Sequence, residues 1–442
     1  MLDRTARDRS SAAINDAWRA VGAGLSRHPS LLLAVSGGPD SLAMLVGLAK
    51  LREAGLLDAS LSAQTIDHGL RPEAAAEAAM VGEVCAELGV KFKATKLGRK
   101  PFARNAQDWA RAERYSALAK TAEDTKSVIL TAHTADDQAE TLLMRAARGT
   151  GSEGLAGIRP QTRLQGARVL RPFLSWPRAD LHAVLDGTPW QPAHDPSNED
   201  DSYTRVRFRR WLADAPMPDG ARSIVDGLAD TAHIAGLENA ALEHYAEGFF
   251  QEVGGAPDGF VDGRLALRVQ PLAVQARFLR LALSSVARGQ SLASNDRTLA
   301  FDLGRMVALA RRIANEPRGR WVGGGAVLDW QRDQDIERVC AYGEAGRSGF
   351  PELDLGPGEQ GRWDGRFEIC NWTQYRLAIR AWQPGDPEPP LDRDGVSHAI
   401  LASLPVAEHD GDVVAMVGGP SKEDCRKTGM AFLGVLPFEP VA

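Results

Sequence analysis

The run Leu-Leu-Leu-Ala-Val-Ser-Gly-Gly-Pro-Asp-Ser, residues 31–41, joins a short apolar stretch to a glycine pair. The apolar part predicts a buried strand, because it is too short for a helix and ends at the glycines. Residues 42–52 place apolar side chains at helical spacing, so the glycine loop should connect a strand to a helix. The N–H groups and the dipole at a helix N-terminus favour a phosphate, and glycine allows close approach of the backbone. The stretch therefore predicts a phosphate-binding loop.

The loop lacks the lysine of the kinase and GTPase type, since the first lysine after it is Lys50. Ser-Gly-Gly-x-Asp-Ser resembles instead the PP-loop of the ATP pyrophosphatases, which cleave ATP between its α- and β-phosphates and leave an adenylate. Asp40 suits that chemistry, because departing pyrophosphate needs Mg²⁺, a cation that takes oxygen ligands. The plain alternative is a glycine turn capped by Ser and Asp. The resemblance implies ATP and Mg²⁺ as cofactors, Asp40 as a metal ligand, and ATP contacts from Ser36, Gly37, Gly38, Pro39, Asp40 and Ser41.

Composition places the chain among ordinary globular proteins. Of its 442 residues, 44% are hydrophobic and 25% charged, and no apolar run is long enough to span a bilayer. The first residues are charged and do not resemble a signal peptide. The four cysteines, Cys85, Cys340, Cys370 and Cys425, form no CxxC pair and indicate reduced thiols rather than a metal site. We expect a cytoplasmic protein without a membrane partner.

Strand-like and helix-like segments alternate through the first part of the chain. This alternation predicts an α/β fold with a doubly wound, mostly parallel sheet, in which ligands bind at the carboxyl ends of the strands. Polar residues follow three of these strands, including Asp67-His68 and His133-Thr134. A hairpin is expected about Gln165-Gly166. The expected strands are 31–35, 61–66, 90–97 and 127–132, and the expected helices are 42–52, 73–88, 105–122 and 134–145.

The remaining sequence suggests two further domains. Residues 215–220, which include Pro216 and Pro218, are a plausible linker. From 221 to about 312 the pattern is helical, with no strand signal, and beyond Trp321 short strand-like runs recur. We expect a catalytic domain over 1–215, a helical middle domain over 216–335 and a small α+β domain over 336–442.

A second motif, residues 131–144, brings together acids and a histidine. If a helix begins near Thr134, then Asp136, Asp137 and Glu140 lie close together near its N-terminal end. Each has an ordinary structural explanation, since Thr134 and Asp137 fit a capping box and His133 fits a hydrogen-bonded strand end. Three carboxylates and a histidine beside a phosphate loop exceed what capping requires.

The order of these motifs resembles the bacterial tRNA(Ile)-lysidine synthetase family. The match is close over the first half of the chain and looser beyond it, and Val206 stands where many members have Asn. The matching runs are 36–41, 67–71, 111–115, 133–141, 148–155, 171–172 and 195–209.

The resemblance implies that ATP adenylates the 2-carbonyl of the first anticodon cytosine in an isoleucine tRNA. Free L-lysine then displaces AMP to form lysidine, so codon recognition changes from AUG to AUA. The partners implied are tRNA(Ile) with a CAU anticodon and free L-lysine, and a homodimer is possible because members are often dimers. The middle domain would bind substrate and the C-terminal domain would bind tRNA.

The resemblance also implies roles for individual residues. Asp137 and Glu140 would bind the lysine ammonium and accept its proton, which must leave because the unperturbed pKa is about 10.4. Which carboxylate holds lysine and which holds cytosine stays open. The implied catalytic residues are Asp40, Arg111, Arg114, His133, Asp137 and Glu140; Asp67 and His68 join the ATP contacts; Arg205, Arg207 and Arg209 face the tRNA.

Two alternative functions fit the sequence less well. Another PP-loop enzyme, such as a tRNA thiolase or an amidating synthetase, would need reactive cysteines or a glutaminase module, and neither is visible. A catalytically idle RNA-binding scaffold has no use for acids that face a phosphate site.

Overall fold

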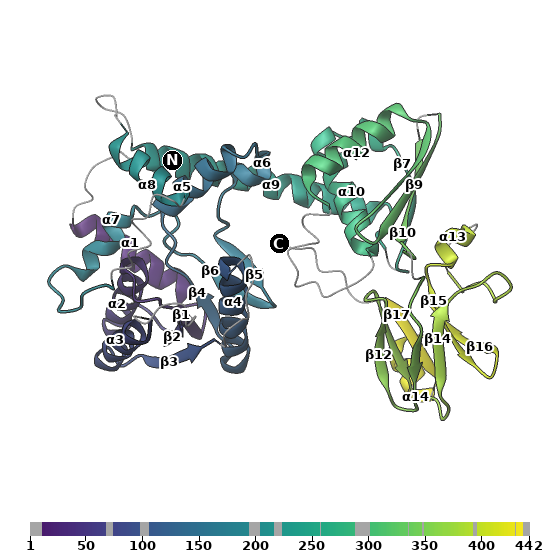
Figure 1. Ribbon diagram of the computed structural model, residues 1–442, viewed down its shortest axis with the longest axis horizontal. Helices are drawn as coiled ribbons and strands as arrows, with labels where there is room; N and C mark the ends of the chain where they lie inside the picture. Colours follow the sequence, from purple (N-terminus) through teal and green to yellow (C-terminus); the bar gives the residue numbers. More distant parts are fainter. Residues whose placement is uncertain are drawn as a thin grey trace. The chain divides into compact units, whose positions relative to one another are not determined.

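The computed structural model describes residues 11–67, 74–97, 106–193, 204–215, 223–256, 258–287, 301–334, 336–346, 349–391, 396–428 and 430–435. The chain forms two compact units, Met1–Asn239 and Ala240–Val441. The long helix α9, Ile224–Glu252, contains the border between them (Figure 1). Each unit is described by itself below.

The first unit is built on a six-stranded sheet of order β3-β2-β1-β4-β6-β5 (Figure 1). Strand β1 pairs in parallel with both β2 and β4, whereas β5 pairs antiparallel with β6. The expected mostly parallel sheet is confirmed. The strands are β1 (Ser30–Ala34), β2 (Ser60–Asp67), β3 (Lys91–Lys96), β4 (Val128–Leu130), β5 (Gln161–Leu164) and β6 (Ala167–Leu170).

The β5–β6 hairpin turns where expected, at Gln165 and Gly166. Both have positive φ, 50° and 84°, the backbone that a two-residue hairpin turn demands. Glycine adopts this conformation without the Cβ clash that other residues suffer. The hairpin adds an antiparallel edge to the parallel sheet.

Helices cover both faces of the sheet, and the alternation along β1 shows how. Leu31 and Leu33 belong to the core that includes α2, whereas Leu32 packs with Tyr115 and Leu118 of α4 on the opposite face. All three leucines are fully buried, which explains the unbroken apolar run. The helices are α1 (Ser11–Leu25), α2 (Pro39–Glu53), α3 (Ala74–Glu87), α4 (Ala106–Thr125), α5 (Ala135–Ala146), α6 (Ser152–Leu155), α7 (Arg178–His182) and α8 (Thr204–Asp214).

Three aromatic rings fix the position of the segment before α7. Trp18, Phe173 and Trp176 pack with ring centroids 5.1 to 5.4 Å apart, and all three are buried. The Trp176 carbonyl accepts a hydrogen bond from the N–H of Ala135 at 2.8 Å. This contact places the start of α7 beside the start of α5.

The second unit contains three antiparallel sheets. Their orders are β7-β10-β9-β8, β11-β14-β15-β16 and β12-β13-β17. The bounds are β7 (Val261–Leu265), β8 (Arg318–Gly323), β9 (Ala326–Asp333), β10 (Ile336–Gly343), β11 (Leu353–Leu355), β12 (Gln360–Trp363), β13 (Phe367–Asn371), β14 (Leu377–Ala381), β15 (Pro405–His409), β16 (Asp412–Met416), β17 (Ala431–Val435), α10 (Leu272–Val286), α12 (Leu303–Asn315), α13 (His398–Leu401) and α14 (Lys422–Thr428).

The expectation of no strand between 221 and 312 is wrong. Strand β7 lies inside that segment and pairs with β10. Its buried residues Val261, Gly263 and Leu265 alternate with Asp262 and Arg264, but the glycine weakens the apolar pattern and hides the strand from sequence inspection. The expected border at 335/336 falls between β9 and β10, which pair in one sheet. The division into three domains stays a prediction.

Within the described residues, no helix combines the length and apolarity needed to cross a bilayer.

We predict that Gly47→Ala destabilises the first unit. A Cβ at this position of α2 would lie 2.1 Å from Cη2 of Trp18, a buried ring with no room to move. We expect a loss of about 1–3 kcal/mol, as for other overpacked cores. Gly24→Ala in α1 is the matched control, because its added Cβ meets no atom within 4 Å. The control should stabilise by up to about 1 kcal/mol through helix propensity. Denaturant unfolding of both variants measures the change in the free energy of unfolding relative to wild type. A Gly47→Ala variant as stable as wild type would contradict the packing described.

Candidate functional site

The glycine loop between β1 and α2 has the shape expected of a phosphate cradle. Gly37 has a φ of 85°, a conformation that favours glycine, and Gly38 is the N-cap of α2. The N–H of Ser36 donates to Oγ of Ser41 at 3.1 Å, and that hydroxyl donates to the carbonyl of Gly38 at 3.0 Å. These bonds hold the loop around the helix N-terminus, where a phosphate is favoured.

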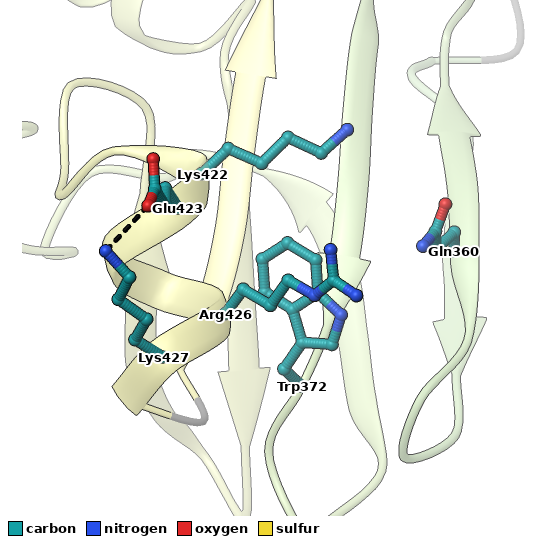
Figure 2. A pocket seen from close by; sticks show the side chains of 6 residues that line it. All are labelled: Gln360, Trp372, Lys422, Glu423, Arg426 and Lys427. Carbon is teal, nitrogen blue, oxygen red and sulfur yellow. Dashed lines mark ion pairs between the residues drawn. The ribbon is translucent and has the colours of Figure 1, made fainter.

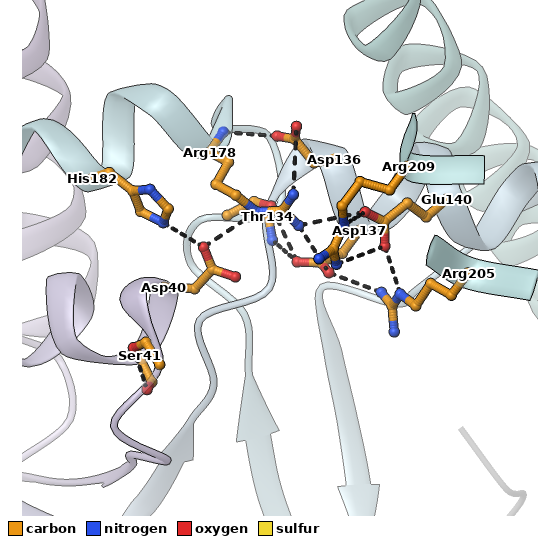
Figure 3. Close-up of polar contacts among 11 residues, drawn as sticks. Asp40, Ser41, Thr134, Asp136, Asp137, Glu140, Arg178, His182, Arg205 and Arg209 are labelled. Carbon is orange, nitrogen blue, oxygen red and sulfur yellow. Dashed lines mark hydrogen bonds and ion pairs between the residues drawn. The ribbon is translucent and has the colours of Figure 1, made fainter. Parts of the chain in front are cut away.

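Asp40, in the first turn of α2, is held by two residues of α7 (Figure 3). Its Oδ1 lies 2.7 Å from Nε2 of His182 and 3.3 Å from Nε of Arg178. Burial acts to raise the pKa of Asp40, but the His182 hydrogen bond and the charge of Arg178 outweigh it, so the pKa lies below its ordinary value. Asp40 is therefore ionised at neutral pH.

Asp137 caps α5 with one carboxylate oxygen and contacts arginines with the other. Its Oδ2 accepts from the N–H of Thr134 at 2.8 Å and from the Thr134 hydroxyl at 3.1 Å, which caps α5. Its Oδ1 accepts from Nη2 of Arg205 at 2.8 Å and lies 3.4 Å from Nη2 of Arg178. The cap thus fixes the carboxylate in place, and its second oxygen faces the arginines.

Glu140 is the most deeply buried acid of this group, with a side chain only 1% exposed. Its Oε2 accepts from Nε of Arg205 at 2.5 Å, and its Oε1 accepts from Nε of Arg209 at 2.8 Å. Arg178 adds a third guanidinium, 3.6 Å from Oε1. A buried carboxylate requires such partners to stay charged.

Arg178 lies at the centre of the site and contacts carboxylates of α2 and α5 (Figure 3). Its backbone N–H donates to Oδ2 of Asp136 at 2.7 Å, and its side-chain Nη1 lies 3.9 Å from Oδ1 of the same acid. Burial acts to lower the pKa of Arg178, but the surrounding carboxylates outweigh it and raise the pKa. We call the full set the carboxylate cluster; it comprises Asp40, Asp136, Asp137, Glu140, Arg178, His182, Arg205 and Arg209.

The charges of the carboxylate cluster do not balance. Four carboxylates face three guanidiniums, so the acids outnumber the arginines by one. Asp136 is the most loosely held of the α5 acids, with a side chain 27% exposed. The cluster can therefore accept one more cation.

The structure changes the interpretation of two arginines. Arg205 and Arg209 were expected to face tRNA, yet both turn inward to the acids of α5, because positions four apart share one face of α8. Arg207 of the same helix is exposed, and within the described part of the chain its side chain donates to the hydroxyl of Thr204, at 3.1 Å, in its own helix.

The other residues of the predicted site are less closely connected. Nδ1 of His133 lies 2.9 Å from the hydroxyl of Thr131. Asp67 ends β2, and Arg114 is exposed on α4. His68 and the side chain of Arg111 lie outside the described residues. No group of three or more His, Cys, Asp or Glu side chains among the described residues is arranged to hold a metal ion.

Sequence inspection missed Arg178 and His182. They lie four positions apart on the five-residue helix α7, so they share a face. A helix this short has no apolar periodicity to reveal it, and neither residue belongs to a glycine-rich or acidic motif.

A separate groove lies in the second unit, between α14 and the sheet of β12 and β13 (Figure 2). Its cavity volume is about 930 Å³. Two of its cations have acidic partners, Lys422 with Glu368 and Lys427 with Glu423, both at 2.6 Å. The lining residues are Gln360, Trp372, Lys422, Glu423, Arg426 and Lys427.

Comparisons with known proteins agree with this architecture. A family model described as a PP-loop domain matches residues 6–215. A tRNA(Ile)-lysidine synthase of Novosphingobium aromaticivorans is 41% identical over 248 residues, which are 55% of this chain and 72% of that protein. One of Methylobacterium nodulans is 37% identical over 321 residues, 71% of this chain and 90% of that protein.

Among solved structures, a U34-tRNA thiolase of Methanococcus maripaludis is similar over 53% of this chain and 80% of its own. Its sequence identity is 15% and the TM-score is 0.42, so we draw no conclusion about function from this similarity. The extent of the matches to those relatives, together with the PP-loop domain, shows that the chain belongs to the tRNA(Ile)-lysidine synthase family.

Proposed function

We propose that this chain ligates free L-lysine to C2 of the wobble cytidine in tRNA(Ile) with a CAU anticodon. ATP is consumed, pyrophosphate and AMP are released, and the product is lysidine. The observation that carries the proposal is the carboxylate cluster itself. It is continuous with the phosphate loop through Asp40, and its four carboxylates outnumber its three guanidiniums. An ammonium substrate next to a phosphate site fits that arrangement.

In the first step the cytosine 2-carbonyl oxygen attacks the α-phosphorus of ATP, and the bond to pyrophosphate breaks. We assign ATP to the loop Ser36–Ser41 and to Asp67 and His68. Arg111 and Arg114, three positions apart on α4, are proposed to stabilise charge on the α-phosphate.

The donors around Asp40 fit Mg²⁺. Mg²⁺ commonly uses one or two carboxylates together with substrate phosphates rather than a cage of protein ligands. Asp40 is ionised, and its contacts with His182 and Arg178 use Oδ1, leaving Oδ2 to bind a cation. Mg²⁺ bound there would offset the negative charge of the leaving pyrophosphate.

In the second step the lysine amine attacks C2 of the adenylated cytosine, and the electrons of the breaking C–O bond leave with AMP. The amine arrives as an ammonium with an unperturbed pKa of about 10.4 and must first lose a proton. We propose that the acids of α5 accept this proton, with Asp137 as the base and Glu140 beside it. His133 is proposed to contact the cytosine or the adenylate phosphate.

Arginines on α8 and in the second unit supply the proposed contacts to tRNA. Arg207 is exposed, whereas Arg205 and Arg209 would reach RNA only by sharing their guanidiniums with Asp137 and Glu140. In the C-terminal region, Arg380 is held by Asp386 and Glu408 at 2.7 Å, and Lys422 and Lys427 of the groove at α14 are also held by acids. Arg426 of that groove pairs with no acid that the structure describes, so it is the better candidate for an RNA contact (Figure 2). The C-terminal tRNA-binding role and a homodimer stay predictions.

The first test is an incubation with ATP, Mg²⁺, labelled lysine and an isoleucine tRNA transcript that carries a CAU anticodon. We expect label in this RNA as a lysine-modified cytidine, and none in a methionine tRNA transcript with the same anticodon. Release of AMP and pyrophosphate without fixed label would keep the adenylation and overturn lysine as the nucleophile. No ATP cleavage with either RNA would contradict an enzymatic role.

Asp137→Asn should separate catalysis from capping. The amide oxygen can still accept the bonds from Thr134, so the helix cap survives, whereas the negative charge and the base are lost. We expect lysine incorporation to fall by about 100-fold or more. The melting temperature should fall as well, because Arg205 and Arg178 lose a carboxylate partner, but the capped helix should remain. Asp214→Asn, at the exposed end of α8, is the matched control and should keep full activity. Normal incorporation by Asp137→Asn would remove Asp137 from the role of base.

The lowered pKa of Asp40 predicts how its contribution to stability depends on pH. Because the folded-state pKa lies below the unfolded value, the ionised form stabilises the protein above about pH 4, and this contribution disappears as the pH falls through the folded-state pKa. The difference in unfolding free energy between wild type and Asp40→Asn should stay constant from pH 8 to about pH 5 and shrink below about pH 4.

Urea unfolding at each pH measures the difference for Asp40. Asp16→Asn is the control, since this acid is 74% exposed and, among the residues that the structure describes, pairs with Arg19 at 3.5 Å. Its variant should show little difference from wild type at any pH. A difference for Asp40→Asn that grows below about pH 4 would contradict a lowered pKa in the folded state.

A further inference from the structure

Helix α8 has two faces of different character. Val206 and Leu212 are buried, and Arg205 and Arg209 reach the acids of α5 on the inward side. The remaining face carries Arg207, Arg210 and Trp211, all exposed. Their positions at i, i+3 and i+4 make them neighbours on the helix surface.

Trp211 is the unusual member of the outward face. It is 52% exposed although tryptophan is among the most hydrophobic side chains, and Arg207, four positions earlier, forms no ion pair with any acid that the structure describes. An aromatic ring flanked by guanidiniums is the arrangement that single-stranded RNA surfaces use, with bases on the ring and phosphates on the cations. A ring beside Arg207, which has no acidic partner among the described residues, suits a polyanion better than an apolar protein surface.

The outward face lies about one helix diameter from the carboxylate cluster. A helix with its side chains is about 10–12 Å across, and the opposite side of α8 binds Glu140. A cytosine that enters the carboxylate cluster must leave its stack, so its neighbours lose a stacking partner. A ring one helix width away can replace that partner.

We infer that Trp211 stacks on a base of the anticodon loop beside the modified cytidine, with Arg207 on the adjoining phosphate. This inference rests on the proposed function, because it takes a single-stranded RNA as the substrate. It assigns α8 two tasks, since the inward arginines hold the acids while the outward face holds the RNA. The surface requires no residue from the second unit.

The test measures binding of the full chain to a fluorescent anticodon stem-loop RNA with a CAU loop. Trp211→Ala should weaken binding by about tenfold or more, the loss typical of a removed base–aromatic stack. Trp211→Phe should restore most of the affinity, because it keeps a ring. Arg207→Ala should weaken binding and reduce the slope of log affinity against log salt by about 1.

Leu237→Ala is the matched control. Leu237 is 59% exposed on α9, so its variant also removes an exposed apolar side chain, and its affinity for the RNA should equal that of wild type. In lysine incorporation, Trp211→Ala should raise the KM for tRNA without changing the KM for lysine, a split that a loss of folding would not produce.

The outcomes separate this inference from the proposed function. Equal RNA affinity of wild type and Trp211→Ala overturns the stacking surface, whether or not the enzyme fixes lysine. No binding of the RNA by wild type overturns it as well. Binding that depends on Trp211 supports the surface even if the wild type transfers no lysine, in which case only the proposed reaction fails.

Discussion

The site depends on a single guanidinium. The Arg178 side chain lies among Asp40, Asp136, Asp137 and Glu140. Its backbone N–H also donates a hydrogen bond to Asp136. Without this positive charge, acids from α2 and α5 would repel each other where the phosphate loop meets α5. The arginine is placed by packing, because the buried rings of Trp18, Phe173 and Trp176 fix the chain just before α7. An apolar contact thus sets the electrostatics of the site.

Helix α8 completes the same network from a distant part of the sequence. Glu140 is almost inaccessible to solvent, and two arginines of α8 satisfy its two oxygens. Buried ion pairs contribute little net stability compared with apolar packing, but removal of one partner leaves a costly unpaired charge. The pairs therefore specify where α8 docks on α5 more than they strengthen the fold. This docking also determines which residues of α8 remain on the outside.

Sequence reasoning succeeded where the signal was local. The loop at residues 36–41 and the cap at Thr134 depend on neighbours within a few positions, so their residue types revealed them. Arg178 lies 42 residues after Asp136, and its helix is too short for any periodicity, so nothing in the sequence connected the two. Arg205 and Arg209 were predicted to contact tRNA, and nothing in the sequence indicated that they also pair with the acids of α5. Spacing along a helix shows which residues share a face, not which way that face points.

The arginine partners of the α5 acids affect how a positively charged substrate can enter the site. In the free protein, Asp137 and Glu140 already contact guanidiniums. A lysine ammonium that arrives would share these partners rather than meet a bare, desolvated charge, which avoids the large cost of an unpaired buried carboxylate. The excess of carboxylates over guanidiniums then favours the entry of a cation. Guanidinium is effectively never deprotonated in proteins, whereas an ammonium can lose its proton, so only the incoming amine can become a nucleophile among these carboxylates.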